Sequence, residues 1–304
     1  GNALKFYKKS GMRTIARGTG LLKLLPGDAE LADAYLPELS DNFFVAKGQI
    51  HPAQGVRKAK VAMLAGCVMA LTHADTLEAT VRVLTRNGIE VHLTTGQGCC
   101  GALNTHSGEP DTAIEMAKKN IDSFLSAKPD AIVSASAGCG AAMKDYGELL
   151  ANEPEYVDKA KQVADLSKDI HELLVEFEFE APTKLMNVKV TYQDPCHLLN
   201  VQRITDAPRT ILNSIPGLEL IDLGEAAVCC GSAGSYNLLQ PAMGNMLKDL
   251  RINLIDQVSA SNQANILVTG NIGCLMHLAS GTDLQVVHTV ELIDWATGGL
   301  KPPD

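Results

Sequence analysis

The chain has 304 residues, a formal net charge of −9 and a sequence pI near 5.4. This acidic balance argues against a nucleic-acid partner, which requires a basic face. No run approaches the roughly 20 apolar residues of a membrane span, and no signal peptide opens the sequence. Hydrophobic residues make up 46 % of the chain but aromatic residues only 4 %. We therefore expect a cytoplasmic protein whose cores of Ala, Val, Leu and Ile pack helices on parallel sheets.

The first 58 residues are predicted to be a helical lead-in to the body of the protein. The sequence begins without Met, so we expect it to be a piece of a longer polypeptide. Residues 4–25 are predicted to be helical, and residues 26–58 are rich in Pro and Gly and are predicted to be irregular. The helical part either covers the body, which we favour, or meets a membrane surface or partner through its basic side chains. These are Lys5, Lys8, Lys9, Arg13, Arg17 and Lys23.

Residues 59–180 predict a first α/β unit. Buried strands are expected at 59–65, 89–94 and 130–134, because each is a short apolar run beside a glycine or polar turn. Helical spacing predicts helices at 72–87 and 111–127 and then at 141–150, 155–166 and 167–178. The acidic segment 176–182, which contains Pro182, is the expected linker to the next unit.

Residues 181–304 repeat this plan. Strands are expected at 188–193, 218–222, 265–269 and 284–287, and helices at 198–214, 241–259 and 290–297. The alternation of strands and helices predicts an α/β fold with parallel sheets flanked by helices. In such sheets, ligands bind outside the carboxyl ends of the strands.

Eight cysteines fall into two sets with the same order, and each set contains Cys-Cys-Gly. The offsets between equivalent cysteines are 129, 130, 130 and 135 residues, so the unit is duplicated. Every cysteine lies in a loop that follows a predicted strand. The sets are Cys67, Cys99, Cys100 and Cys139, and Cys196, Cys229, Cys230 and Cys274.

These sets predict a metal or cluster site. Thiolates are the preferred ligands of iron–sulfur clusters and of structural zinc. Adjacent cysteines favour a cluster, whose separate irons bind neighbouring thiolates, over a single zinc ion. A disulfide ranks last, because a bond between adjacent cysteines is strained. His277 lies three residues after Cys274, so it is either a fifth ligand or an ordinary helix histidine.

The repeated pattern resembles the cysteine-rich CCG domain shared by heterodisulfide reductases, lactate-utilisation iron–sulfur proteins and glycolate oxidase iron–sulfur subunits. The sequence is most similar to the last of these. The resemblance implies two Rossmann-like CCG repeats related by a pseudo-twofold axis. It rests on GQGCCGALN (96–104), SAGCGAAMKDYGELL (136–150), DPCHL (194–198), CCGSAGSYNL (229–238) and ANILVTGNIGCLMHL (264–278).

The resemblance also implies a role. The chain would be the electron-transferring subunit of a glycolate dehydrogenase complex, with no catalytic residues of its own. A partner subunit with FAD would oxidise glycolate to glyoxylate, and electrons would pass to a quinone at the inner face of the cytoplasmic membrane. Family members carry an N-terminal ferredoxin-like part with two Cys-x2-Cys-x2-Cys-x3-Cys-Pro motifs, which this sequence lacks.

The third cysteine position departs from the heterodisulfide reductase pattern. Where that pattern has Cys-x-x-Cys, this sequence has Ala142 after Cys139 and His277 after Cys274. Four thiols per repeat imply a [4Fe–4S] cluster in at least one repeat, and they leave zinc open in the other. Two alternatives stay open: a thiol or iron–sulfur module of the disulfide reductase type, and an interaction subunit stabilised by zinc.

Overall fold

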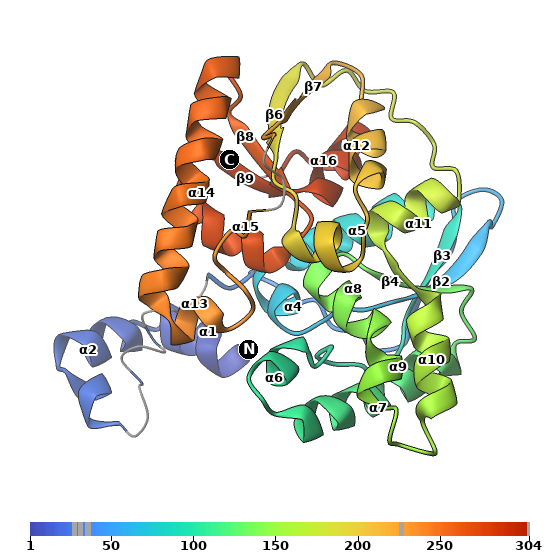
Figure 1. Cartoon of the computed structure of the whole chain (residues 1–304), viewed down its shortest axis with the longest axis horizontal. Coiled ribbons are helices and arrows are strands. Elements are labelled where there is room, and N and C mark those ends of the chain that lie inside the picture. Colours follow the sequence, from blue (N-terminus) through green and yellow to red (C-terminus); the bar gives the residue numbers. More distant parts are fainter. Residues whose placement is uncertain (26–28, 30–32, 34–37, 225–227, 303–304) are drawn as a thin grey trace.

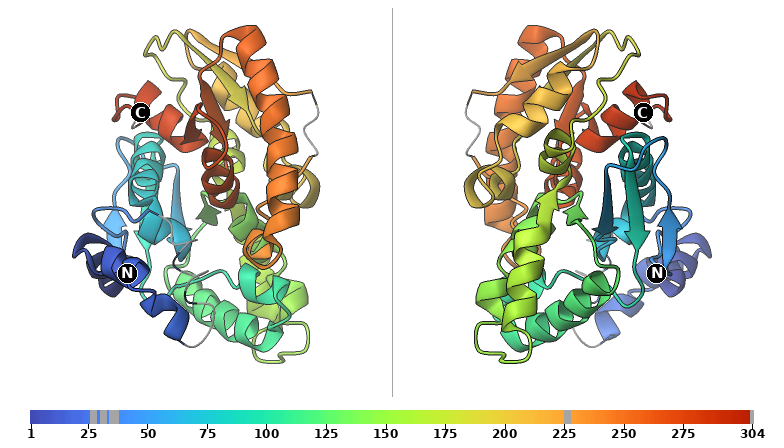
Figure 2. Two further views of the ribbon diagram at one scale, coloured as in Figure 1. Left: turned by 90° about the vertical axis from the view of Figure 1, so that its left-hand side faces the viewer. Right: turned by 90° about the vertical axis from the view of Figure 1, so that its right-hand side faces the viewer.

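The computed structural model describes residues 1–25, 29, 33, 38–224 and 228–302. Two β-sheets, each covered by helices, make up the body of the molecule (Figure 1). This arrangement confirms the predicted α/β fold class. Figure 2 shows the two sheets at different heights, with helices between them.

The first sheet has the strand order β1-β3-β2-β4-β5. All of its pairings are parallel except that of β1 with β3. The buried runs of small β-branched and apolar residues in β2 and β4 suit a sheet covered on both faces. The strands are β1 (Gln49–His51), β2 (Ala59–Met63), β3 (Ile89–Leu93), β4 (Ala131–Ser134) and β5 (Ser167–Asp169).

The second sheet copies this topology, with the parallel order β7-β6-β8-β9. The register is also copied: Val61 lies between Val91 and Ala131, and Val190 lies between Leu220 and Ile266. The two halves are therefore structural repeats. The strands are β6 (Val188–Tyr192), β7 (Leu218–Asp222), β8 (Ile266–Thr269) and β9 (Gln285–His288).

Helices cover both faces of each sheet. The first half and its N-terminal segment contain α1 (Asn2–Lys9), α2 (Met12–Gly18), η1 (Leu21–Leu24), α4 (Val68–Thr72), α5 (Ala74–Arg86), α6 (Ala102–His106), α7 (Pro110–Ser126), α8 (Ala137–Lys144), α9 (Tyr146–Leu149), α10 (Val157–Leu166) and α11 (Ile170–Glu176). The second half contains η2 (His197–Val201), α12 (Asp206–Asn213), α13 (Tyr236–Leu239), α14 (Pro241–Asn262), α15 (Ile272–Ala279) and α16 (Thr289–Ala296).

Four predictions of local structure outside the cysteine-bearing loops were wrong. The helix expected at 4–25 is three pieces, because Gly11 and Gly20 adopt positive φ. The lead-in at 26–58 contains strand β1, although part of it lies outside the described residues. The helix expected at 167–178 begins with strand β5. The helix expected at 198–214 is interrupted where Arg203 has a φ of 57°.

The two halves pack against each other through helices that hold equivalent places in the two repeats. Helix α5 of the first half packs on α16 of the second, and α11 packs on α12. One apolar core continues across this contact and includes Leu84 and Leu173 from the first half and Ile211, Val290 and Ile293 from the second. The two contacts are therefore equivalent to each other, as a pseudo-twofold axis between the repeats requires.

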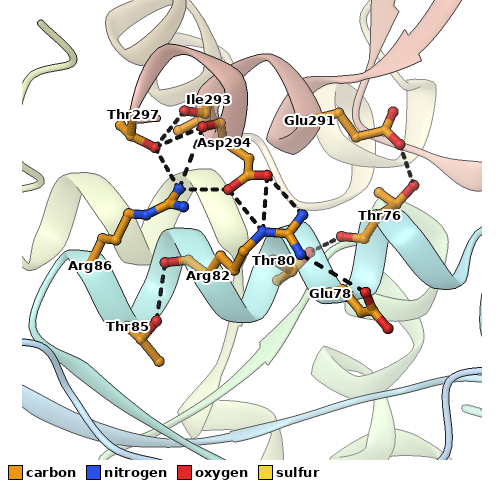
Figure 3. A network of polar contacts seen from close by, with 10 residues as sticks. All are labelled: Thr76, Glu78, Thr80, Arg82, Thr85, Arg86, Glu291, Ile293, Asp294 and Thr297. Atoms are coloured by element: carbon orange, nitrogen blue, oxygen red, sulfur yellow. Dashed lines mark hydrogen bonds and ion pairs between the residues drawn. The ribbon is translucent and has the colours of Figure 1, made fainter. Parts of the chain in front are cut away.

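A buried carboxylate at the same contact holds two arginines (Figure 3). Asp294 on α16 accepts hydrogen bonds from Arg82 at 2.8 Å and from Arg86 at 2.6 Å, both on α5. Its side chain is only 2 % exposed. Beside it, the Thr76 hydroxyl donates to Glu291 at 2.8 Å. These bonds connect residues more than 200 positions apart and fix how the two sheets face each other.

The N-terminal helices lie at the edge of the body (Figure 1). Their basic side chains bind nearby acids: Lys9 pairs with Asp41, and Arg13 and Arg17 pair with Asp33. Much of the apolar surface stays exposed, including Phe6, Ile15 and Leu24. Within the ranges that the structure describes, none of the helices has the length and apolar character of a membrane span.

We predict that Asp294→Ala destabilises the chain by about 2 kcal/mol. Breaking a buried ion pair costs about 3–5 kcal/mol, and the loss is smaller here because the side chains of Arg82 and Arg86 are 34 % and 24 % exposed. Urea unfolding measures the difference. The control is Glu219→Ala, which removes an exposed pair with Lys189 and should cost less than about 0.5 kcal/mol. Equal losses in the two variants would contradict the prediction.

Candidate metal centre

In the first half, four cysteines lie at the carboxyl ends of three neighbouring strands. Cys67 follows β2 and precedes α4, Cys99 and Cys100 lie between β3 and α6, and Cys139 lies in the first turn of α8. The chain runs from β2 to β3 on one side of β2, and then from β3 to β4 on the other side of β2. This is the switch point at which open α/β sheets bind ligands.

The second half places its cysteines at the equivalent strand ends. Cys196 follows β6 and precedes η2, Cys229 and Cys230 follow β7, and Cys274 lies in the first turn of α15. The sequence predicted a loop at Cys139 and Cys274, whereas α8 and α15 have already begun there. All four N–H groups of a first helical turn lack partners within the helix, so both thiols lie at an electropositive end.

The thiols within each set contact one another. Cys67 and Cys99 have their sulfurs 3.5 Å apart, and Cys230 and Cys274 have theirs 3.0 Å apart. All eight cysteines are free thiols. Across the described residues, no three or more His, Cys, Asp or Glu side chains already surround a position for one metal ion.

Glycine is required after each cysteine pair. Gly101 and Gly231 both have a φ of 87°, in the left-handed region that side chains disfavour. This conformation directs the Gly101 N–H to the Cys99 sulfur at 3.4 Å and the Gly231 N–H to the Cys229 sulfur at 3.3 Å. Each half thus donates a backbone hydrogen bond to the first sulfur of its cysteine pair.

These donors favour a thiolate. Hydrogen bonds from Cys100 and Cys67, with the N–H of Gly101, lower the pKa of Cys99 to about 2. The equivalent donors in the second half lower the pKa of Cys229 to about 2. The thiolate is the form of cysteine that binds metals. Each set therefore contains one sulfur that is ready to act as a ligand.

Two buried side chains hold the first cysteine pair in place. The Asn120 amide donates to the carbonyl oxygen of Cys99 at 2.8 Å, and its oxygen accepts from the N–H of Gly98 at 2.8 Å. The Tyr146 hydroxyl donates to the carbonyl oxygen of Cys100 at 2.9 Å. The sequence analysis did not identify either residue, since nothing local marks a polar side chain that helices α7 and α9 turn toward this loop.

One cavity of about 660 Å³ lies between the halves and is lined by cysteines of both sets. Its walls combine apolar side chains, such as Val68 and Leu103, with polar ones, such as Lys248. His106 and His197 come from opposite halves, and their ring centroids are 5.9 Å apart. The volume is in the range of small-molecule sites. The two thiol sets therefore face the same cavity.

His277 lies on the wall of this cavity and is nearly buried. Its Nε2 lies 3.2 Å from the carbonyl oxygen of Gly244, and its Nδ1 lies 3.3 Å from the Asn237 amide. Both ring nitrogens are therefore engaged. A metal could bind His277 only if one of these bonds were released.

Asp194 anchors the loop that precedes Cys196. Its buried carboxylate accepts two hydrogen bonds from Arg209 on α12, at 2.8 and 2.7 Å. Arg209 also donates to Asp222 at the end of β7. The pair ties the loop before Cys196 to the strand before Cys229. Arg209 gave no signal in the sequence because it is one of many helical basic residues.

Comparisons with known proteins agree with this arrangement. The sequence model of the family described as "Cysteine-rich domain", or CCG, matches residues 61–144 and 190–279. The model described as "Glycolate oxidase iron-sulfur subunit, linker region" matches residues 1–35. Two CCG domains thus account for both thiol sets. The chain belongs to the family of glycolate oxidase iron–sulfur subunits.

Two relatives illustrate this membership. The probable glycolate oxidase iron–sulfur subunit of Bacillus subtilis is 33 % identical over 96 % of this chain and 67 % of its own length. The glycolate oxidase iron–sulfur subunit of Escherichia coli is 36 % identical over 79 % of this chain and 58 % of its own length. The chain therefore spans about two thirds or less of these relatives.

A solved structure shares the fold. A hypothetical protein from Helicobacter pylori aligns with a TM-score of 0.54 and 11 % identity, over 85 % of this chain and 52 % of that chain. At this identity the likeness shows the fold alone.

We predict that Gly231→Ala destabilises the chain by about 2–4 kcal/mol. A new Cβ would contact the carbonyl oxygen of Gly244 and lie 3.1 Å from Leu247, in addition to the cost of a positive φ. The control is Gly108→Ala, which has a φ of 77° and no described atom within 4 Å of its new Cβ. It should cost about 1 kcal/mol. Thermal or urea unfolding compares the two, and equal losses would show that no steric contact constrains Gly231.

Proposed function

We propose that this chain is the iron–sulfur electron-transfer subunit of a glycolate dehydrogenase complex. A flavin-bearing partner subunit with FAD oxidises glycolate to glyoxylate, and this chain passes the electrons toward a quinone. The observation that carries the proposal is the pair of equivalent thiol sets that open on one cavity. The relatives named as glycolate oxidase iron–sulfur subunits support the substrate class.

The proposed ligands are the eight cysteines, four in each half. A thiol set fits an iron–sulfur cluster in three ways: sulfurs of the set contact each other, two of its cysteines are adjacent, and a glycine N–H points at one of the sulfurs. We assign a [4Fe–4S] cluster to at least one repeat and leave zinc open for the other. For His277 both alternatives stay open: a fifth ligand of the second half, or a helix histidine held by Asn237 and Gly244.

An iron–sulfur cluster supplies one-electron transfer when it is bound. The chain contributes the conditions for that transfer. The N–H groups of Gly101 and Gly231 donate to sulfur and so stabilise added negative charge there. The burial of Cys100 and Cys230 excludes water from the inner side of each set. The contact of α5 with α16 fixes how the two halves face each other.

The cavity between the halves is the proposed place where electrons leave. Its apolar walls suit a quinone ring, and His106, His197 and Lys248 offer hydrogen bonds to quinone oxygens. A quinone lies in the membrane, so we place the chain in the cytoplasm, peripherally at the inner face of the membrane. The exposed Phe6, Ile15 and Leu24 of the N-terminal helices provide apolar surface for that association.

We predict that anaerobically reconstituted protein binds iron and shows a broad visible absorption band. If both halves hold a cluster, Cys100→Ser and Cys230→Ser each remove about half of the iron, because each breaks one four-thiol set. Iron and zinc analysis measures this, with Ser261→Ala on the exposed face of α14 as the control. Colourless protein that binds zinc and unfolds on chelation would instead support an interaction subunit.

We also predict that glycolate bleaches the visible band only when the flavin-bearing subunit is present. In the proposed complex the partner subunit oxidises the hydroxy acid, so electrons reach this chain only from the partner. Stopped-flow absorbance of the complex, with glycolate and then lactate, gives the substrate class. Disulfide reduction by the isolated chain, lost in Cys229→Ser with its metal content intact, would favour the disulfide reductase alternative.

A further inference from the structure

Two helix N-cap residues at equivalent positions make no caps. Ser136 precedes α8 and Asn271 precedes α15, and each lies three residues before the last cysteine of its set. Ser and Asn are among the best N-cap residues because their side chains accept hydrogen bonds from the helix N-terminus. Neither side chain accepts such a bond from its own helix here. Both side chains therefore make hydrogen bonds other than a helix cap.

Both side chains face sulfur. The Asn271 amide donates to the Cys274 sulfur at 3.3 Å. In the first half, hydrogen bonds from Cys100 and from Ser136 lower the pKa of Cys139 in spite of its burial. Equivalent residues thus lie beside equivalent thiols, although one is a hydroxyl and the other an amide.

The same two residues also bind each other across the pseudo-twofold axis. The Ser136 hydroxyl donates to Asn271 Oδ1 at 3.0 Å, and the N–H of Gly138 donates to the same oxygen at 3.1 Å. A backbone N–H can only donate, so this contact fixes which end of the amide is oxygen. The Asn271 NH2 group is then the end that faces Cys274.

A rigid and buried seam surrounds the pair. His288 Nε2 lies 2.7 Å from the carbonyl oxygen of Ala135, the N–H of Ala137 donates to Gly270 at 3.2 Å, and Gln202 donates to the carbonyl oxygen of Ala137 at 2.8 Å. The Nδ1 of His288 accepts from the N–H of Val290, so Nε2 carries the proton and donates. The contact between Ser136 and Asn271 is thus held from both halves.

We propose that Ser136 and Asn271 are positioning residues that donate to the sulfurs of Cys139 and Cys274 and couple the two thiol sets to each other. The inference rests on the proposed function, because it requires a redox centre in each half. Ser136 has one hydroxyl proton and two acceptors, Asn271 Oδ1 and the Cys139 sulfur. Negative charge on the first set draws that proton toward Cys139. Asn271 then loses a donor and becomes a weaker donor to Cys274.

The coupling has a defined sign. With a cluster bound in each half, an electron added in the first half would weaken the hydrogen bond from Asn271 to Cys274. This would lower the potential of the second half, since hydrogen bonds to sulfur raise cluster potentials. The two sets therefore resist being reduced together. This contribution travels through one contact and adds to the direct repulsion between their charges.

The test is a redox titration of the reconstituted full chain followed by electron paramagnetic resonance. Cys100→Ser and Cys230→Ser assign the signals to the halves. In Asn271→Ala we expect the midpoint potential of the second half to fall and that of the first half to rise, because Ser136 then donates to Cys139 alone. In Ser136→Ala the potential of the first half should fall. The control is Asn245→Ala, in which an amide that lines the same cavity is removed.

Intact clusters with unchanged potentials in Asn271→Ala or Ser136→Ala would overturn the inference, and so would shifts as large in Asn245→Ala. If Asn271→Ala does not bind a cluster, Asn271→Ser is the deciding variant, because its hydroxyl restores a hydrogen-bond donor. A midpoint potential of the second half near that of the wild type then supports the inference, and a lowered potential overturns it. Wild-type protein without any cluster would overturn the proposed function itself, which separates the two failures.

Discussion

Parallel strands end at a common edge, and the rest of this structure depends on that constraint. A cysteine placed after each of three neighbouring parallel strands is brought to its companions by the sheet itself, whatever the intervening helices are. Duplication then gives two such edges. The contacts of α5 with α16 and of α11 with α12 turn the edges toward one cavity. Sheet topology thus positions the thiols, and helix packing makes them face each other.

Much of this could be predicted from the sequence, because the signals were local. Buried strands such as β2 and β8 are short apolar runs, and the cysteine pairs recur at a nearly constant offset along the chain. Strand β5 was missed because its residues, Ser167, Lys168 and Asp169, are polar and few. It forms because β4 offers an unpaired edge, which is a tertiary condition.

The side chains of the site divide in the same way, into those that local sequence signals identified and those whose role depends on tertiary packing. The cysteines were found from their spacing, but Asn120 and Tyr146 reach the first cysteine pair from helices far along the chain. The contact between Ser136 and Asn271 joins residues 135 positions apart. An alignment of the two repeats would have revealed that both precede a cysteine by three residues. It could not have shown that they touch, since that depends on how the halves pack.

The bond between α5 and α16 also has a consequence for biosynthesis. The ribosome makes Arg82 long before its partner Asp294, which follows 212 residues later. Until α12 and α16 emerge, the parts of α5 and α11 that pack on them stay uncovered, so the first repeat completes its core only after the second is made. Whatever occupies the thiol sets is therefore inserted before closure or into the finished chain, and a chaperone that shields α5 and α11 would set the time available.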